Sequence, residues 1–91
     1  MRNHRKPRDT ISFNPPTSIN DNGRLIHIIF ALPGITEEQV RIDLEKTDFI
    51  LSIVDDDRIL RKTIQIPEGV RLFKKKFSFG VLEIFLEKPS P

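Results

Sequence analysis

Apolar and polar side chains alternate in short runs along most of this chain. Between Gln39 and Glu45, for example, Val40, Ile42 and Leu44 occupy every second position. Such alternation places one face of an extended strand in a core and the other face in water. Runs of this kind, separated by Pro, Gly, Asn or Asp, predict seven strands, at residues 17–20, 24–31, 39–45, 49–54, 58–66, 70–79 and 80–88.

The predicted strands differ in how much of each face is apolar. Residues 24–31 are apolar on both faces, which indicates a central strand, whereas the short run at 17–20 indicates an edge strand. Thr36 is placed to cap one helical turn, and Asp55-Asp56-Asp57 leaves room only for a tight hairpin connection. With no long helix and regularly spaced turns, the pattern predicts an all-β, antiparallel sandwich of about seven strands.

Charge is unevenly distributed along the 91 residues. The excess of positive charge lies at the start, in Arg2, Arg5, Lys6 and Arg8. With Asp9 the first ten residues carry +3, which leaves eleven basic and twelve acidic groups, or −1, for the rest. We expect one domain, divided into a basic disordered tail at 1–14, a folded part at 15–88 and a short end at 89–91. Because the folded part has no basic excess, nucleic acid is not an expected partner.

The chain carries no recognisable catalytic or metal-binding constellation. His4 falls in the expected tail, and His27 lies within a strand with no carboxylate or serine at motif spacing. Three adjacent aspartates in a tight turn, Asp55-Asp56-Asp57, cannot all converge on one cation. The glycines are scattered and form no phosphate-binding loop. We therefore expect no enzyme activity, no cofactor and no bound metal.

Composition also bears on where the protein works. The chain has no cysteine, which excludes disulfides and thiolate metal sites. The longest apolar run, at residues 28–33, is far too short to cross a bilayer, and the basic start lacks the apolar stretch of a secretory signal. These features predict a soluble, cytoplasmic protein without membrane contact.

Aromatic residues gather near the end of the chain, at Phe73, Phe77, Phe79 and Phe85. If Leu82, Ile84 and Leu86 form the core face of the last strand, Val81 and Phe85 point the other way. The rings either fill a thin core from the far sheet or remain exposed for a partner, and the pattern leaves both readings open. An apolar patch beside an edge strand is one way in which a β-module captures an extended peptide.

Three consecutive lysines, Lys74 to Lys76, fall inside the same predicted strand. In a regular strand Lys75 points to one face, and Lys74 and Lys76 point to the other. Lysines on an edge strand protect it against pairing with another chain. A site for a polyanion is the alternative interpretation of this run.

Several segments resemble, in order and spacing, the α-crystallin domain of small heat-shock proteins. The matching segments are Ala-Leu-Pro-Gly-Ile (31–35), Thr-Glu-Glu-Gln (36–39), Val-Arg-Ile-Asp-Leu (40–44), Ile-Leu-Ser-Ile (50–53), Ile-Gln-Ile-Pro-Glu-Gly (64–69) and Gly-Val-Leu-Glu-Ile (80–84). The likeness extends over residues 15–88. It implies an immunoglobulin-like β-sandwich and ATP-independent binding of unfolding proteins under stress, which limits their aggregation.

The resemblance also implies a binding site. In that family a peptide groove lies between the strands that match residues 40–44 and 74–79. The groove residues implied for this chain are Val40, Ile42, Phe77 and Val81, with Phe79 and Phe85 as further exposed apolar side chains. Unpaired strand edges and apolar grooves are the physical basis of such binding.

The chain departs from the family at the parts used for assembly. Asp55-Asp56-Asp57 stands where the family has a long loop with an extra strand, the residues from Glu87 onward lack the Ile-x-Ile tail, and the start is short and basic. Lys75 and Phe79 stand where an Ala and an Asn are common. We therefore expect a monomer or small oligomer that binds unfolding clients or a chaperone partner. The alternative is a monomeric co-chaperone or adaptor domain of the related CS type, which docks one defined protein.

Overall fold

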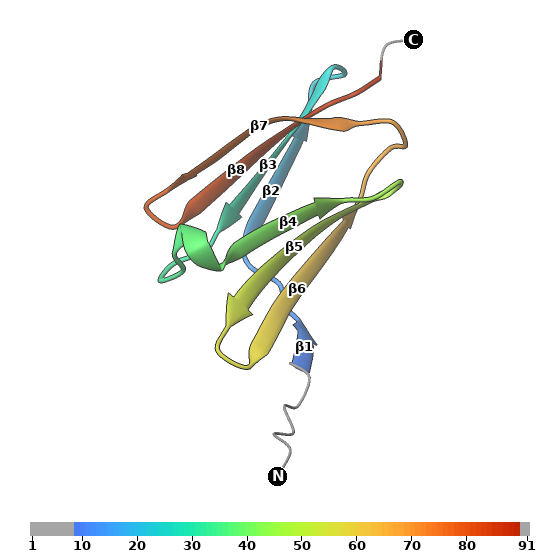
Figure 1. Ribbon diagram of the computed structural model, residues 1–91. Coiled ribbons are helices and arrows are strands. Elements are labelled where there is room, and N and C mark those ends of the chain that lie inside the picture. Colours follow the sequence, from blue (N-terminus) through green and yellow to red (C-terminus); the bar gives the residue numbers. More distant parts are fainter. Residues whose placement is uncertain (1–8, 90–91) are drawn as a thin grey trace.

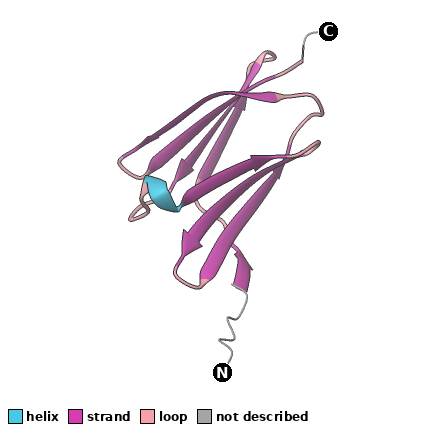
Figure 2. Ribbon diagram, in the orientation of Figure 1, coloured by secondary structure: helices cyan, strands magenta, loops and turns pink. Residues whose placement is uncertain are grey.

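The computed structural model describes residues 9–89, which form two stacked β-sheets of four strands each (Figure 1). The first sheet has the order β1 (Asp9–Ser12), β6 (Arg58–Gln65), β5 (Asp48–Asp55) and β4 (Val40–Leu44). The second has the order β2 (Thr17–Asp21), β3 (Leu25–Ala31), β8 (Val81–Glu87) and β7 (Arg71–Ser78). Between residues 9 and 89 the helical structure is a short 3-10 turn, η1 (Glu37–Gln39), in front of β4 (Figure 2).

The predicted β-sandwich is confirmed, as are several of its local features. β2 is an edge strand and β3 lies in the centre of its sheet, between β2 and β8. The side-chain oxygen Oε1 of Gln39 accepts a hydrogen bond from the Thr36 backbone N–H at 3.0 Å, which caps η1 where the sequence predicts a helical turn. Asp55 pairs directly with Arg58, so the β5–β6 connection is the tight turn that the three aspartates predict.

One strand was not expected, because β1 lies in the segment that the sequence assigns to a tail. β1 pairs in parallel with β6, from Asp9 opposite Arg58 to Ser12 opposite Arg61. All four of its side chains are exposed, so the segment lacks the alternating pattern that marks a half-buried strand. The sandwich therefore has eight strands, one more than the alternation predicts, and residues 9–12 of the expected tail form part of a sheet. Residues 1–8 of the expected tail and residues 90–91 lie outside the described part.

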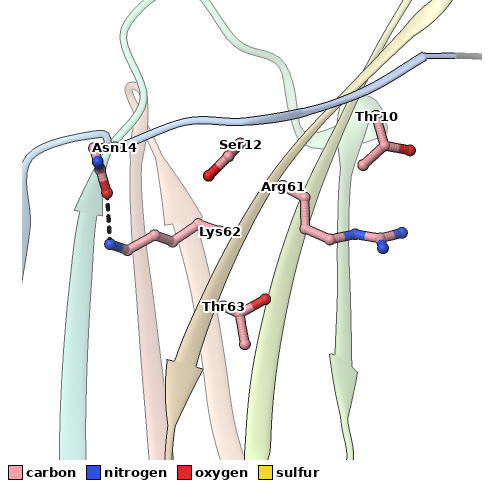
Figure 3. A pocket seen from close by; sticks show the side chains of 6 residues that line it. All are labelled: Thr10, Ser12, Asn14, Arg61, Lys62 and Thr63. Atoms are coloured by element: carbon pink, nitrogen blue, oxygen red, sulfur yellow. Dashed lines mark hydrogen bonds between the residues drawn. The ribbon is translucent and has the colours of Figure 1, made fainter.

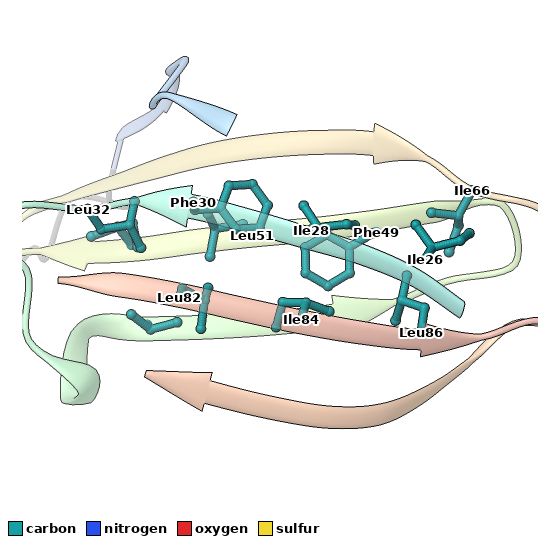
Figure 4. Close-up of a cluster of buried hydrophobic side chains, with 12 residues drawn as sticks. Ile26, Ile28, Phe30, Leu32, Phe49, Leu51, Ile66, Leu82, Ile84 and Leu86 are labelled. Carbon is teal, nitrogen blue, oxygen red and sulfur yellow. The ribbon is translucent and has the colours of Figure 1, made fainter. Parts of the chain in front are cut away.

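Most of the core consists of the inward-facing side chains of three strands, β3, β5 and β8, and Leu32, Val40 and Ile66 complete it (Figure 4). Along the three strands the inward-facing side chains alternate with half-buried residues, as a period of two requires. The inward residues are Ile26, Ile28 and Phe30 of β3, Phe49, Leu51 and Ile53 of β5, and Leu82, Ile84 and Leu86 of β8. Phe30 and Phe49 stack across the two sheets with their ring centroids 6.0 Å apart and their planes at 14°.

Two motifs that are distant in the sequence, Leu32-Pro33-Gly34 and Gly80-Val81-Leu82, meet at one end of the second sheet. The Leu32 N–H donates to the Gly80 carbonyl oxygen at 2.6 Å. Gly80 has a φ of +74°, and a Cβ at this position would lie 3.1 Å from the Leu32 carbonyl oxygen. The close approach and the positive φ together explain why glycine stands here.

At the other end of that sheet, Asp21 ties β2 to the residue that follows β8. Its carboxylate accepts a hydrogen bond from Lys88 Nζ at 2.8 Å and another from the Gly23 backbone N–H at 2.9 Å. The bond from Lys88, followed by that from Gly23, holds the pKa of Asp21 below its ordinary value.

A substitution at Phe30 tests the packing of the core, because its ring is fully buried and stacks on Phe49 of the other sheet. We expect Phe30→Ala to lower the free energy of unfolding by about 3–5 kcal/mol, through lost burial and the cavity that remains. Chemical denaturation followed by circular dichroism measures the change. The control Ile19→Ala, at an edge residue that is 54% exposed, should cost far less; equal losses would argue against the packing described.

Asp21 provides a test of pH dependence. A carboxyl whose pKa is depressed on folding stabilises the protein above its unfolded-state pKa, and this contribution is lost as the pH falls through the folded-state value. The melting temperature of Asp21→Asn should therefore lie below that of the unsubstituted protein near neutral pH, and the difference should shrink below about pH 4. Asp43→Asn, on an exposed carboxylate of β4, serves as the control. A difference that stays constant with pH would contradict the assigned role of Asp21.

Candidate functional site

The edge strands β4 and β7 lie on the same side of the sandwich, one in each sheet (Figure 1). Within residues 9–89 no strand pairs with their outer edges, so each presents unpaired backbone N–H and C=O groups. On the opposite side the chain crosses between the sheets from β1 to β2, and Phe13 of this crossing packs against the core. The β4–β7 side is therefore the more open flank of the core.

A small apolar pocket lies at this opening. It has a volume of about 110 Å³ and is lined by Ile42, Asp43 and Leu44 of β4, Phe49 of β5 and Leu72 of β7. Small-molecule sites usually measure roughly 300–1,000 Å³, so this pocket is too small for a cofactor and suits a single apolar side chain. We define Ile42, Leu44 and Leu72 as the edge groove.

The four groove residues implied by the family resemblance occupy different environments. Ile42 lines the pocket, and Phe77 is half-buried on β7 and packs against the core. Val40 is 5% exposed and belongs to the core itself. Val81 precedes the buried Leu82 in β8, so it points to the outer face of the sheet. The structure therefore brings Ile42 together with Leu44 and Leu72, and none of Val40, Phe77 and Val81 lines the pocket.

Leu72 could not be assigned to the groove from the sequence, because β7 contains a bulge. The register runs from Leu72 opposite Leu86 directly to Lys74 opposite Phe85, which leaves Phe73 without a partner. Uninterrupted alternation would place Leu72 and Phe77 on opposite faces of β7. The extra residue reverses this relation, so Leu72 and Phe77 both face inward, opposite Leu86 and Leu82. Leu44, by contrast, continues the visible alternation of β4.

The lysines of β7 are arranged as the alternation predicts. Lys75 lies opposite the core residue Ile84, whereas Lys74 and Lys76 lie opposite the outward residues Phe85 and Glu83. All three lysines are exposed. Lys76 Nζ is 4.0 Å from Glu83, and Lys74 Nζ is 6.0 Å from the centroid of the Phe85 ring. Lysines on both faces of an open edge hinder its pairing with another sheet.

Phe85 and His27 form a stacked pair on the outer face of the second sheet. Their ring centroids lie 4.2 Å apart with an interplanar angle of 10°, and His27 Nε2 lies 3.0 Å from Glu83 Oε1. Stacking leaves Phe85 half-buried, so it is a less accessible apolar side chain than the sequence implies. His27 forms part of this surface cluster rather than of a catalytic arrangement.

Phe79, the other side chain expected to be exposed, stands at the tip of the β7–β8 hairpin. Ser78 pairs with Val81, so the turn consists of Phe79 and Gly80, with φ angles of +52° and +74°. Positive φ at both central residues is the type I′ geometry, which favours Asn-Gly and disfavours a bulky aromatic residue. The ring of Phe79 has no cover at all, at 101% relative exposure. The turn thus presents a strained and fully accessible aromatic side chain beside the domain.

Two further features, a metal-binding cluster and a membrane-spanning helix, are absent from residues 9–89. No cluster of His, Cys, Asp and Glu side chains there is arranged to hold a metal ion. In the same range no helix is long and apolar enough to cross a membrane.

Comparison with known proteins connects this geometry to one fold. No family model and no curated protein matches the sequence. Among solved structures, a C-terminally truncated form of the small heat-shock protein AgsA from Salmonella typhimurium has a TM-score of 0.73 at 14% identity, over 87% of this chain and 91% of that one. Heat shock protein 16.0 from Schizosaccharomyces pombe has a TM-score of 0.72 at 19% identity, over 87% and 76% of the two chains.

A small heat-shock protein from the Synechococcus phage S-ShM2 resembles this chain about as well as the two proteins above. Its TM-score is 0.70 at 21% identity, over 85% of this chain and 89% of that one. These matches show that the chain has the α-crystallin-domain fold of small heat-shock proteins, as its sequence segments imply.

The strained turn gives a testable prediction. Phe79→Asn should raise the free energy of unfolding by about 1 kcal/mol, because Asn tolerates the left-handed conformation that Phe79 adopts. Thermal melting measures the change. Phe73→Asn, at an exposed residue with no positive φ, is the matched control and should bring no such gain. A loss of stability in Phe79→Asn would instead show that the ring contributes to packing.

Proposed function

We propose that this domain is an ATP-independent chaperone module that binds apolar segments of unfolding proteins and limits their aggregation. The observation that carries the proposal is the edge groove, where Ile42, Leu44 and Leu72 line an apolar pocket between two unpaired strand edges. The similarity of the fold to small heat-shock proteins supports the same class of activity.

The physics of the groove suggests how a client would be held. An extended segment can add to an open strand edge through backbone hydrogen bonds and place alternate side chains on the neighbouring surface. Burial of one Leu or Ile side chain contributes about 2 kcal/mol, whereas micromolar binding requires about 8 kcal/mol. The pocket alone is therefore insufficient, and a client must make further contacts.

Two exposed aromatic side chains are available for those contacts. Phe73, at the β7 bulge, is 59% exposed, and Phe79, at the end of the same strand, is fully exposed. In this proposal Phe73 lies next to Leu72 of the groove and Phe79 stands at the far end of β7, and both bind apolar side chains of a client with little specificity. Binding of this kind depends on desolvation, so it requires no nucleotide, cofactor or catalysis.

The cellular setting belongs to the proposal as well. We infer a cytoplasmic role in the stress response, as a monomer or small oligomer whose partners are unfolding proteins or another chaperone. The short turn at Asp56-Asp57 supports a low assembly state, because it leaves no loop between β5 and β6 for exchange with a second subunit.

Suppression of aggregation tests the function directly. Two unrelated client proteins are heated with the purified chain at near-stoichiometric ratio, and light scattering follows their aggregation. The chain should suppress scattering for both clients, and Leu72→Ser should weaken the effect severalfold by removing an exposed side chain of the edge groove. Ile19→Ser, on the edge strand β2, is the control and should retain full activity.

The same aggregation assay distinguishes the chaperone function from the adaptor alternative. An adaptor of the CS type would leave both clients unprotected while it captured one cellular protein tightly. That result, with circular dichroism showing a folded domain, would replace the chaperone proposal. If the unsubstituted chain and Leu72→Ser suppressed aggregation equally, the chaperone function would stand, but the edge groove would not be where clients bind.

A further inference from the structure

The outer face of the second sheet, which points away from the first sheet, carries a row of uncharged residues at one end (Figure 1). Ala31 of β3 pairs with Val81 of β8, which in turn pairs with Ser78 of β7. On the other side of β3, the Ala31 N–H donates to the carbonyl oxygen of Pro16, just before β2, at 3.0 Å. We call these four residues the end row. Within residues 9–89 no third layer covers this face, so the end row is open to solvent.

An apolar hollow of about 250 Å³ lies at the half of the end row that belongs to β2 and β3. The Thr17 hydroxyl, in its wall, donates to the Pro15 carbonyl oxygen at 2.8 Å and is therefore already hydrogen-bonded within the chain. An apolar cavity of about 150 Å³ is sufficient to bind benzene, so this hollow has room for a phenyl ring. It is lined by five uncharged residues: Pro16, Thr17, Ser18, Ile29 and Ala31.

The hollow between β1 and β6 is larger, but its side chains do not converge on one point. Figure 3 shows Arg61 and Lys62 extending from β6 in different directions. Lys62 pairs with the buried Leu51 and Arg61 pairs with Ser52, so the two side chains belong to opposite faces of the sheet. The hollow between β2 and β3, by contrast, presents one kind of surface to a single group.

Phe79 stands at the other half of the same end of the sheet. With Gly80 it forms the β7–β8 turn, directly after Ser78 of the end row. Its ring is completely exposed, and its φ of +52° is unfavourable for an aromatic residue. Packing within the domain therefore does not compensate for this strain, which is a reason to look for a contact outside the domain.

The hollow and Phe79 occupy symmetric positions on the sheet. In the order β2-β3-β8-β7 the hollow lies at the first two strands and the turn joins the last two, so both are equally far from the midline between β3 and β8. A two-fold axis parallel to the strands, above this midline, turns the outer face of one copy onto that of another. The rotation lays Phe79 of each copy over the hollow of the other, and Val81 of each copy over Ala31 of the other.

We propose that the outer face of the second sheet binds a second copy of this chain, with the ring of Phe79 from each copy seated in the hollow of the other. The charges favour a copy at this face over a copy at the open edge of β7. Antiparallel pairing of two β7 edges would bring the lysines of Lys74–Lys76 from both copies together. The end row has no charge, and in the row beside it Lys76 and Glu83 are paired with each other, 4.0 Å apart.

The proposed interface is small. Burial of a Phe side chain removes about 150–250 Å² from water, so the two rings and the hollows that receive them bury roughly 800 Å² in total. Stable interfaces usually bury about 1,200–2,000 Å². We therefore expect a weak dimer with a dissociation constant on the order of 100 μM. Its formation does not depend on chaperone activity, and at lower concentrations the monomer leaves Phe79 exposed.

Sedimentation velocity of the full-length chain, from about 10 μM to about 1 mM, tests the proposal. The average mass should rise from that of a monomer toward that of a dimer. Phe79→Asn should stay monomeric over the whole range, because it lacks the ring that enters the hollow. Phe73→Asn, at another exposed phenylalanine near β8, is the matched control and should associate as the unsubstituted chain does.

Nuclear Overhauser effects in a mixture of ¹³C-labelled and unlabelled chains locate the contact. Intermolecular effects should connect the ring protons of Phe79 with the methyl groups of Ile29 and Ala31. Ser18→Glu, which places a carboxylate in the wall of the hollow, should weaken association severalfold while circular dichroism shows a folded domain. A monomer at every concentration, undiminished association of Phe79→Asn, or contacts from Phe79 to the edge groove instead would each overturn the proposal.

Discussion

The stacking of Phe30 on Phe49 is the contact on which the arrangement of the sandwich depends. These two rings fill the space between the sheets at their centre, and the aliphatic side chains of β3, β5 and β8 pack around them. β4 and β7 are edge strands, and between residues 9 and 89 no further strand lies beyond them. The side chains of Ile42, Leu44 and Phe77 on these strands are only half-buried. The packing that stabilises the centre therefore leaves an apolar margin at the edge, where the edge groove forms.

The two edges of the first sheet have different chemical character. At one edge, β4 contributes apolar side chains to the edge groove, whereas at the other edge all four side chains of β1 are exposed. The pairing of β4, β5 and β6 is continuous between these two edges.

The sequence predicted the architecture because most strands bury one face, and burial leaves a period of two. β3, β5 and β8 follow this rule, and their core residues were visible in advance. β1 could not be recognised, since backbone pairing with β6 holds it and none of its side chains is buried. Of the edge groove, Ile42 is among the residues that the resemblance implies. Leu72 is not, because the bulge at Phe73 changes which side chains of β7 face inward. A bulge depends on pairing with β8, and the local sequence does not reveal it.

The pairing of β3 with β8 has a consequence for how the protein is made. On one side β3 pairs with its sequence neighbour β2, but on the other side all seven of its residues, from Leu25 to Ala31, pair with Val81–Glu87, the last strand of the sandwich. During synthesis β3 therefore emerges long before its central neighbour and must wait with an apolar edge open to solvent. Contacts between such distant segments also slow folding. A domain proposed to shield unfinished proteins is thus itself exposed to aggregation until its final strand is complete.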